Sequence, residues 1–426
     1  MAITGRAGTP LTALAISASI PAMPLQLSSP AQCGLDPARL TRIDDWMQRY
    51  VDQGRFPFAA TMIARKGRVA WQGHTGHADI EVETAYTPDT LVRMYSMTKP
   101  VTSTAFMMLY EQGLVHLDDP VSMFIPEFAD VQVLTPDAER LDQTEALRTP
   151  MSVHHLLTHT SGLTYGFNQD LLSETYGKNR LDFGQRAGGL AETTVRLTAT
   201  PLLFQPGSRW HYSVATDVVG RIVEVVSGKT LDRFFADNIL GPLEMDDTSF
   251  VVPSSKMGRL GPCYAYDPKG GMPVFPTGFG EGEVDTFSGG GGLVSTGRDY
   301  LRFAEMLRRG GVLGDVRLLG RHTVSLMTSN HLPGGVDLAT LGPSAWCETS
   351  FSGVGFGLGF AISLNPAQSM LSASAGDFSW GGMASTYFWC DPKEELSVVF
   401  LTQLLPSSTW PNRKELRTLV YQAIVD

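Results

Sequence analysis

The sequence predicts an α/β (α+β) protein, with a mixed antiparallel sheet flanked by helices and built from both chain ends. Strand patterns occur early in the chain, at 59–64 and 69–72. They return only in its last part, at 355–363, 386–390 and 396–401. In between, apolar residues recur mostly at helical spacing, as at 152–158, 189–198, 214–227 and 230–238. We therefore expect a mainly helical domain inserted into the sheet domain.

Local signals support the elements next to this insertion. Asp36 is a suitable N-cap for an amphipathic helix that ends before Gly54. Lys66-Gly67-Arg68 joins the first two strands as a hairpin. Three further helices are predicted, at 98–112, 298–309 and 414–424.

At 426 residues the chain exceeds the usual size of one hydrophobic core. We assign 1–34 to an N-terminal extension, 35–95 with 286–426 to the α/β domain, and 96–285 to the helical domain, with the active site at the interface of these two domains.

The 43 acidic residues outnumber the 33 basic ones, and the formal net charge is -10. This balance argues against nucleic acid or an anionic membrane as a partner, because both attract Lys- and Arg-rich surfaces.

The four cysteines, Cys33, Cys263, Cys347 and Cys390, show no C-x-x-C spacing. We expect free thiols in a reducing compartment, and therefore a cytoplasmic protein. Residues 8–24 are mildly apolar but interrupted by prolines and polar residues, which fits a secretory signal or a membrane span poorly. A periplasmic or secreted location and cleavage of the extension stay open as alternatives.

The strongest chemical signal is Ser96-Met97-Thr98-Lys99. At the start of a helix the serine and lysine share one face, with β-carbons about 5–6 Å apart. The amine can then accept or relay the serine proton, and the helix N-terminus favours the negative charge of a developing oxyanion. Pro100 suits the first helical turn, where its missing N–H costs nothing. A four-residue pattern also arises by chance, so Ser96 is at this point a candidate nucleophile.

Two other segments are candidates for the same active site. Tyr212 precedes an apolar helix and could shuttle a proton near a cation; alternatively it is a half-buried tyrosine at a helix start. The segment Trp380-Gly381-Gly382-Met383 precedes a predicted strand. Its glycines allow a ligand to approach the backbone, and the next N–H could bind an oxyanion; alternatively it is a tight turn beneath a packed tryptophan.

In this order and spacing the three motifs resemble those of the class C β-lactamase and penicillin-binding superfamily. The nearest resemblance is to its esterase branch, the family VIII carboxylesterases, and it extends from about residue 35 to the end of the chain. Four more segments carry it: 91–95 (Leu-Val-Arg-Met-Tyr), 156–163 (Leu-Leu-Thr-His-Thr-Ser-Gly-Leu), 204–207 (Phe-Gln-Pro-Gly) and 289–293 (Gly-Gly-Gly-Gly-Leu).

The resemblance implies a β-lactamase-like fold and a role for each matching residue. Ser96 would be the nucleophile, Lys99 its first activator, and Tyr212, kept partly anionic by Lys99, the general base that returns the proton to the leaving alcohol. The backbone N–H groups of Ser96 and Met383 would form the oxyanion hole. Substrate would contact the preceding residues, Trp380, Gly381 and Gly382.

Two departures from the lactamase pattern predict the substrate. Val214 replaces the Asn of Tyr-x-Asn, and Trp380 replaces the Lys of Lys-Thr-Gly, which helps to hold the carboxylate of a β-lactam. Losing a charge-assisted contact costs about 1.5–3 kcal/mol, or about 10- to 150-fold in binding. We therefore expect a serine carboxylesterase for neutral short-chain esters, with weak β-lactam hydrolysis as a side activity.

Rival functions use the same nucleophile. They are a class C-like β-lactamase or D-amino-acid peptidase, an acyltransferase, and a penicillin-binding sensor that is acylated without turnover. No cofactor or metal is expected. His154, His155 and His159 cluster with an i, i+4 pair, but no carboxylate completes a zinc motif there. The large aromatic residues expected to narrow the cleft, besides Trp380, are Tyr165, Phe279 and Phe287.

Overall fold

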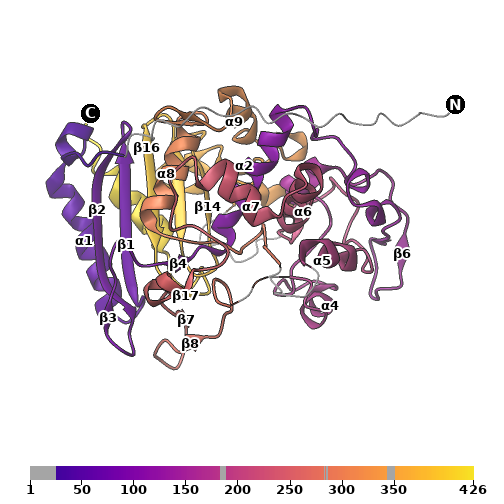
Figure 1. Ribbon diagram of the computed structural model, residues 1–426, viewed down its shortest axis with the longest axis horizontal. Coiled ribbons are helices and arrows are strands. Elements are labelled where there is room, and N and C mark those ends of the chain that lie inside the picture. Colours follow the sequence, from indigo (N-terminus) through magenta and orange to yellow (C-terminus); the bar gives the residue numbers. More distant parts are fainter. Residues whose placement is uncertain (1–24, 183–188, 283, 285, 343–350) are drawn as a thin grey trace.

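The computed structural model (Figure 1) describes residues 25–426 except 183–188, 283, 285 and 343–350. Most of the expected N-terminal extension, including the apolar residues 8–24, lies outside the described residues, and so does Cys347. Cys33, Cys263 and Cys390 are free and buried. The described part of the extension contacts the sheet domain, because Leu27 bridges to Val69.

One eight-stranded antiparallel sheet draws its strands from both ends of the chain, as predicted (Figure 1). β1 (Phe58–Arg65) and β2 (Arg68–Asp79) form the expected hairpin, whose turn residues Lys66 and Gly67 both have positive φ. The C-terminal strand β16 (Leu396–Leu401) pairs directly with β1. The order is β12-β13-β14-β15-β16-β1-β2-β3, with β3 at Thr84–Ala85, β12 at Val354–Phe356, β13 at Ala361–Ser363, β14 at Phe378–Gly381 and β15 at Tyr387–Asp391.

Helices cover both faces of this sheet, because strand side chains alternate between two apolar clusters. Ala59 of β1 belongs to the cluster formed with α1 (Pro37–Asp52) and α12 (Asn412–Tyr421). Its neighbour Ala60 belongs to the cluster on the other face, which includes α8 (Gly297–Arg308). β1 and β16 are therefore buried on both faces, and they form a rigid centre for the sheet.

The inserted region is mainly helical, as predicted. Its central helix pair is α2 (Thr98–Glu111) and α6 (Ala215–Ser227), which pack against each other. The other helices that surround α6 are α3 (Val153–Leu157), α5 (Gly189–Leu197) and α7 (Leu231–Phe235). α2, which begins two residues after Ser96, thus packs against α6, which begins three residues after Tyr212.

Short elements complete the described chain. The helices are α4 (Ser173–Lys178), α9 (Arg321–Met327), α10 (Leu338–Leu341) and α11 (Pro366–Ser369). The strands are β4 (Val92–Arg93) with β9 (Val294–Ser295), β5 (Val133–Leu134) with β6 (Thr144–Glu145), β10 (Val312–Leu313) with β11 (Val316–Arg317), and β8 (Val274–Phe275), β7 (Cys263–Ala265) and β17 (Leu404–Leu405) in one sheet.

Three sequence predictions need correction. The single strand predicted at 355–363 is wrong: the chain turns between β12 and β13, where Gly359 has a φ of 95°. Strand β14 was not predicted, because its four residues end in glycine and show no clear alternation. The helix predicted at 230–238 ends as an α-helix at Phe235 and continues as a π-helical turn, Ala236–Leu240. The proposed domain boundaries stay a prediction, although β7 of the inserted region pairs with the C-terminal strand β17.

Candidate active site

Ser96 lies in a short 3-10 turn, Tyr95–Met97, between β4 and the start of α2. The preceding residue, Tyr95, has a φ of 46°, a left-handed conformation that is strained for a residue with a side chain. The Tyr95 ring is buried, and it packs edge-on against Phe279 with ring centroids 5.6 Å apart. This packing holds the strained turn, which places the Ser96 side chain beside the first turn of α2.

Lys99 is fully buried, and its amine touches three oxygen atoms. Its Nζ donates to Ser96 Oγ at 3.3 Å, to the Tyr165 hydroxyl at 2.9 Å and to the Gly290 carbonyl at 2.8 Å. Burial lowers the pKa of Lys99 to about 7, although the carboxylate of Asp217 opposes this shift. The amine is therefore about half deprotonated near neutral pH, where a lysine in water is fully charged.

Tyr212 packs its ring against the same amine. Lys99 Nζ lies 4.6 Å from the centroid of the Tyr212 ring, and Trp380 Nε1 donates to the Tyr212 hydroxyl at 3.4 Å. Burial raises the pKa of Tyr212 above its ordinary value, while hydrogen bonds with Ser96 and Trp380 oppose the rise. This direction differs from the expectation that Lys99 keeps Tyr212 partly anionic: the buried environment favours the neutral phenol.

The glycine-rich segment 289–292 fits between α2 and α6 because it has no side chains. A β-carbon on Gly289 would lie 2.9 Å from the Thr216 carbonyl, and one on Gly290 would lie 2.5 Å from Asp217 Oδ2. α2 also binds the segment directly, since Thr102 Oγ1 donates to the Gly289 carbonyl at 2.7 Å. The glycine run thus brings a backbone carbonyl within reach of Lys99.

Gly382 allows the β14–β15 turn to approach the Ser96 turn. A β-carbon at this position would lie 2.4 Å from the Met94 carbonyl and 2.2 Å from Thr386 Oγ1. The turn is fixed by a hydrogen bond from Gly382 N to the Thr386 carbonyl at 2.9 Å. The structure therefore brings Met383, the second predicted oxyanion donor, into a turn that packs against the residues just before Ser96.

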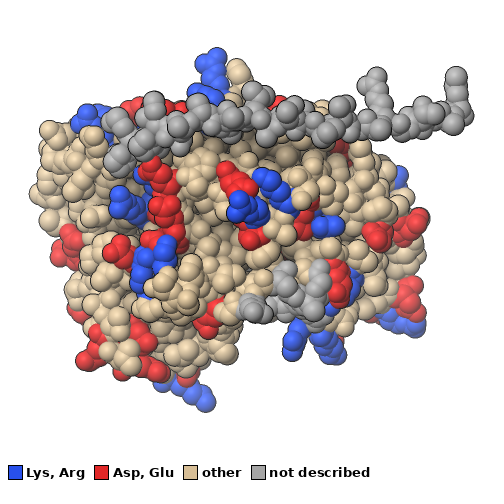
Figure 2. Space-filling view, viewed as in Figure 1, with Lys and Arg blue, Asp and Glu red and all other residues tan. Residues whose placement is uncertain are grey.

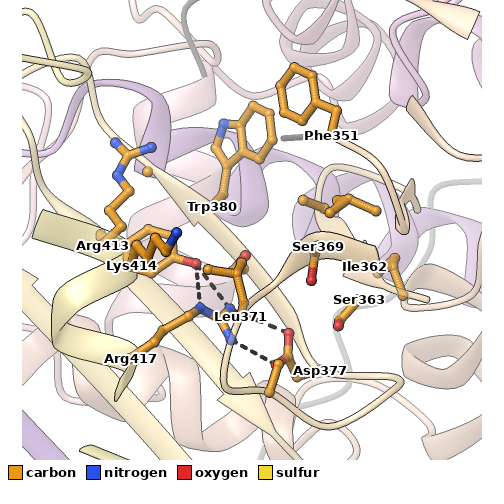
Figure 3. A pocket seen from close by; sticks show the side chains of 16 residues that line it. Phe351, Ile362, Ser363, Ser369, Leu371, Asp377, Trp380, Arg413, Lys414 and Arg417 are labelled. Atoms are coloured by element: carbon orange, nitrogen blue, oxygen red, sulfur yellow. Dashed lines mark hydrogen bonds and ion pairs between the residues drawn. The ribbon is translucent and has the colours of Figure 1, made fainter. Parts of the chain in front are cut away.

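Aromatic side chains surround Tyr212 and Trp380. The Phe356 ring lies 5.3 Å from that of Trp380, and the buried His159 ring lies 4.8 Å from that of Tyr212. Next to Trp380 is a cavity of about 100 Å³, with Phe351 beside the tryptophan and the buried ion pair of Asp377 and Arg417 on the far side (Figure 3). The cavity extends from β14 toward helix α12.

The other expected cleft residues have different places. Tyr165 is fully buried as a partner of Lys99, so it is part of the site and does not simply narrow the cleft. Phe287 packs against Phe250, with ring centroids 5.4 Å apart, and Phe279 supports Tyr95. Asp217, in the first turn of α6, is a buried residue near Lys99 that no sequence motif indicates.

Two general properties bear on partners. Among the described residues, no group of three or more His, Cys, Asp or Glu side chains is arranged to hold a metal ion. No helix in the described ranges combines the length and apolar character needed to cross a membrane. On the face shown in Figure 2, the basic and acidic side chains are interspersed.

Comparison with known proteins identifies the family. A family model described as Beta-lactamase matches residues 43–422. The chain belongs to the beta-lactamase family. It is 36% identical to Protein Rv1367c of Mycobacterium tuberculosis (strain ATCC 25618 / H37Rv) over 361 residues, 83% of this chain and 88% of that protein. It is 32% identical to Esterase EstB of Burkholderia gladioli over 398 residues, 88% of this chain and 93% of the esterase.

A solved structure agrees with this assignment. EstCE1, described as a hydrolase with promiscuous acyltransferase activity, superposes with a TM-score of 0.76 at 27% sequence identity, covering 90% of this chain and 99% of that one. The matches confirm the predicted β-lactamase-like fold and the predicted enzyme class, a serine hydrolase of carboxylic esters.

Within the beta-lactamase family this member departs from the lactamase motifs at two buried or half-buried positions. Val214 is buried and carries no side-chain amide. Besides Ser96, Lys99 Nζ contacts the Tyr165 hydroxyl and the Gly290 carbonyl. Trp380 directs its indole N–H at Tyr212, so this strand position carries no positive charge. This beta-lactamase-family member therefore lacks the positive charge that the lactamase motif places at this strand position, although Arg413 and Lys414 line the cavity next to Trp380.

Proposed function

We propose that the protein is a serine carboxylesterase that hydrolyses short-chain esters through an acyl-enzyme on Ser96. The observation that carries this proposal is the set of contacts made by Lys99 Nζ. A neutral amine has two hydrogens and one lone pair. If the hydrogens point to the Tyr165 hydroxyl and the Gly290 carbonyl, the lone pair is left for the proton of Ser96, 3.3 Å away.

In the proposed acylation, neutral Lys99 takes the hydroxyl proton of Ser96 while Oγ attacks the ester carbonyl carbon. The carbonyl oxygen becomes an oxyanion, which the backbone N–H groups of Ser96 and Met383 stabilise. When the C–O bond to the alcohol breaks, the neutral phenol of Tyr212 gives its proton to the leaving oxygen. The Lys99 ammonium then reprotonates the phenolate, so both groups return to their starting state.

Deacylation runs the same transfers in reverse, with water in place of the alcohol. Lys99 takes the proton of Tyr212, and the phenolate accepts a proton from the attacking water. The tetrahedral intermediate collapses to the carboxylic acid as Lys99 returns a proton to Ser96 Oγ. One ester and one water are consumed, and one acid and one alcohol are released.

Support for neutral esters as substrates comes from the strand position of Trp380. Trp380 supplies no charge for a substrate carboxylate, and its neighbour Phe356 is apolar. The preference for short acyl groups follows from the resemblance to the family VIII carboxylesterases. Weak hydrolysis of β-lactams is part of the proposal, since the nucleophile and its activators would be shared.

We expect the enzyme to turn over a p-nitrophenyl ester of a short acid with a kcat/KM at least about tenfold above that for a chromogenic cephalosporin, the size of a missing charge-assisted contact. Steady-state absorbance assays with both substrates measure this ratio. A higher kcat/KM for the cephalosporin would favour a β-lactamase.

Acyl transfer is the second candidate function, because EstCE1 is described as a hydrolase with promiscuous acyltransferase activity. An acyltransferase would form a new ester when an alcohol is added to the assay. A burst of product without steady turnover would indicate a penicillin-binding sensor that is acylated once.

The pH dependence of kcat/KM should follow the amine. The pKa of Lys99 is lowered to about 7 and the base must be neutral, so activity is expected to rise with pH and reach half its maximum near pH 7. The pKa of Tyr212 is raised, so a decline from loss of the phenol proton should begin only above pH 10. Initial rates in buffers of constant ionic strength test both limbs. Activity that falls between pH 6 and 8 would contradict the proposed base.

A further inference from the structure

Asp217 is a buried carboxylate that the proposed mechanism does not use. It is 7% exposed and lies in the first turn of α6. Its Oδ1 accepts hydrogen bonds from Ser288 Oγ at 2.6 Å and from Gly290 N at 3.1 Å, while Oδ2 has no hydrogen-bond partner among the described residues. An isolated buried carboxylate is costly, and an apolar side chain would fill the same space without that cost.

The Asp217 carboxylate is connected to the Lys99 amine through a single residue, Gly290. Asp217 fixes the N–H of Gly290, and the carbonyl of the same glycine accepts the hydrogen bond from Lys99 at 2.8 Å. The space is tight, because a β-carbon on Gly290 would lie 2.5 Å from Asp217 Oδ2 and 3.1 Å from the Tyr165 hydroxyl. Lys99, Tyr165, Gly290 and Asp217 therefore form one packed cluster.

We propose that Asp217 is a positioning residue: it holds the Gly290 carbonyl against Lys99 and places a carboxylate near the amine. The inference rests on the proposed function, because it assigns Asp217 a role through the Ser96–Lys99 pair. Asp217 does not contact the reacting atoms in this proposal. It acts through the glycine segment and through its charge.

The sign of the electrostatic effect follows from the groups around the amine. The negative charge of Asp217 raises the pKa of Lys99 and opposes the larger lowering by burial. Burial also raises the pKa of the Asp217 carboxyl, and the hydrogen bond from Ser288 and the charge of Lys99 oppose that rise. The titratable groups that face these two residues from neighbouring segments are His159, Tyr165, Asp182 and Tyr212. Removing the carboxylate charge alone should therefore lower the pKa of Lys99 further, so that the amine stays neutral in more acidic solution.

The test is Asp217→Asn, which keeps an oxygen for Ser288 and Gly290 but removes the charge. In a plot of kcat/KM against pH, we expect the rise on the acidic side (the acid limb) to move to lower pH by about one unit. This is the smallest pKa change usually caused by a nearby opposite charge. Asp217→Ala also removes the hydrogen bonds to the glycine segment, so it should in addition lower the kcat of the plateau about tenfold or more. Circular dichroism and thermal melting establish that each variant is folded.

Asp299→Asn is the matched control. Asp299 is also a buried carboxylate that accepts one backbone N–H, from Asp247 at 2.8 Å, and one hydroxyl, from Thr248 at 2.9 Å. Its replacement should leave the acid limb in place. A D217N pH profile that coincides with that of the wild type, or an equal shift in D299N, would overturn the inference.

Fluorophosphonate labelling distinguishes failure of the proposed function from failure of the inference. If Ser96 is not labelled in the wild-type enzyme, both are wrong. If Ser96 is labelled but the pH profile of D217N is unchanged, only the inference is wrong.

Discussion

Ser96→Ala is expected to lower kcat for a short ester by about 10⁴- to 10⁶-fold, the range seen when the nucleophile of a serine hydrolase is removed. The reason is that Ser96 Oγ is the only oxygen in the proposed scheme that forms the acyl bond. Circular dichroism should show an unchanged fold, since the side chain is small and, within the described part of the chain, its loss removes hydrogen bonds with Lys99 and Tyr212. Initial-rate assays of purified protein measure the effect.

Ser103→Ala is the control on the same helix. Ser103 is buried in α2, and its hydroxyl has no hydrogen-bond partner among the described residues, so its loss should leave kcat nearly unchanged. Peptide mapping after fluorophosphonate treatment should place the label on Ser96 in the wild-type enzyme. Wild-type turnover by Ser96→Ala, or a label on another serine, would contradict the assignment of the nucleophile.

Gly382→Ala is expected to lower kcat by about 10²- to 10³-fold without loss of the fold, the cost of one misplaced oxyanion donor. The new β-carbon would collide with the Met94 carbonyl, which is backbone and cannot turn aside. The β14–β15 turn must then move away from the Ser96 turn and carry the Met383 N–H with it. Kinetics with the same short ester, together with thermal melting, distinguish this effect from unfolding.

A second glycine serves as a comparison. Gly258 has nothing within 4 Å of the place where a β-carbon would lie, and its φ is not positive. Gly258→Ala should therefore keep both kcat and the melting temperature of the wild type. If Gly382→Ala also kept full activity, the Met383 N–H would not be the second oxyanion donor.

The sequence predicted the sheet from both chain ends because β1 and β16, which pair with each other, consist mostly of apolar residues. It predicted Ser96, Lys99, Tyr212 and Trp380 as a set because the family motifs are linear, and each residue could be matched by position. The structure brings these four side chains together, while their catalytic roles stay predictions. The short strand β14 escaped prediction because four residues that end in glycine carry too little periodic signal.

Contacts between distant segments could not be predicted from the linear pattern. Tyr165 looked like a bulky cleft residue, and only the fold shows its hydroxyl 2.9 Å from Lys99. The sequence led to no prediction for Asp217, because nothing in its neighbours along the chain indicates that its side chain faces a buried loop. The pKa of Tyr212 could not be predicted either, because it depends on how deeply the fold buries the ring.

The pairing of β1 with β16 also affects how the molecule is made. During synthesis the first hairpin and the turn that carries Ser96 leave the ribosome early, but β16, the neighbour of β1, and the turn with the Met383 amide come near the end of translation. Contacts so remote along the chain form slowly, because a large loop must close first. The nascent polypeptide should thus stay chemically inert until its last strands emerge, and it gains reactivity only as a finished molecule.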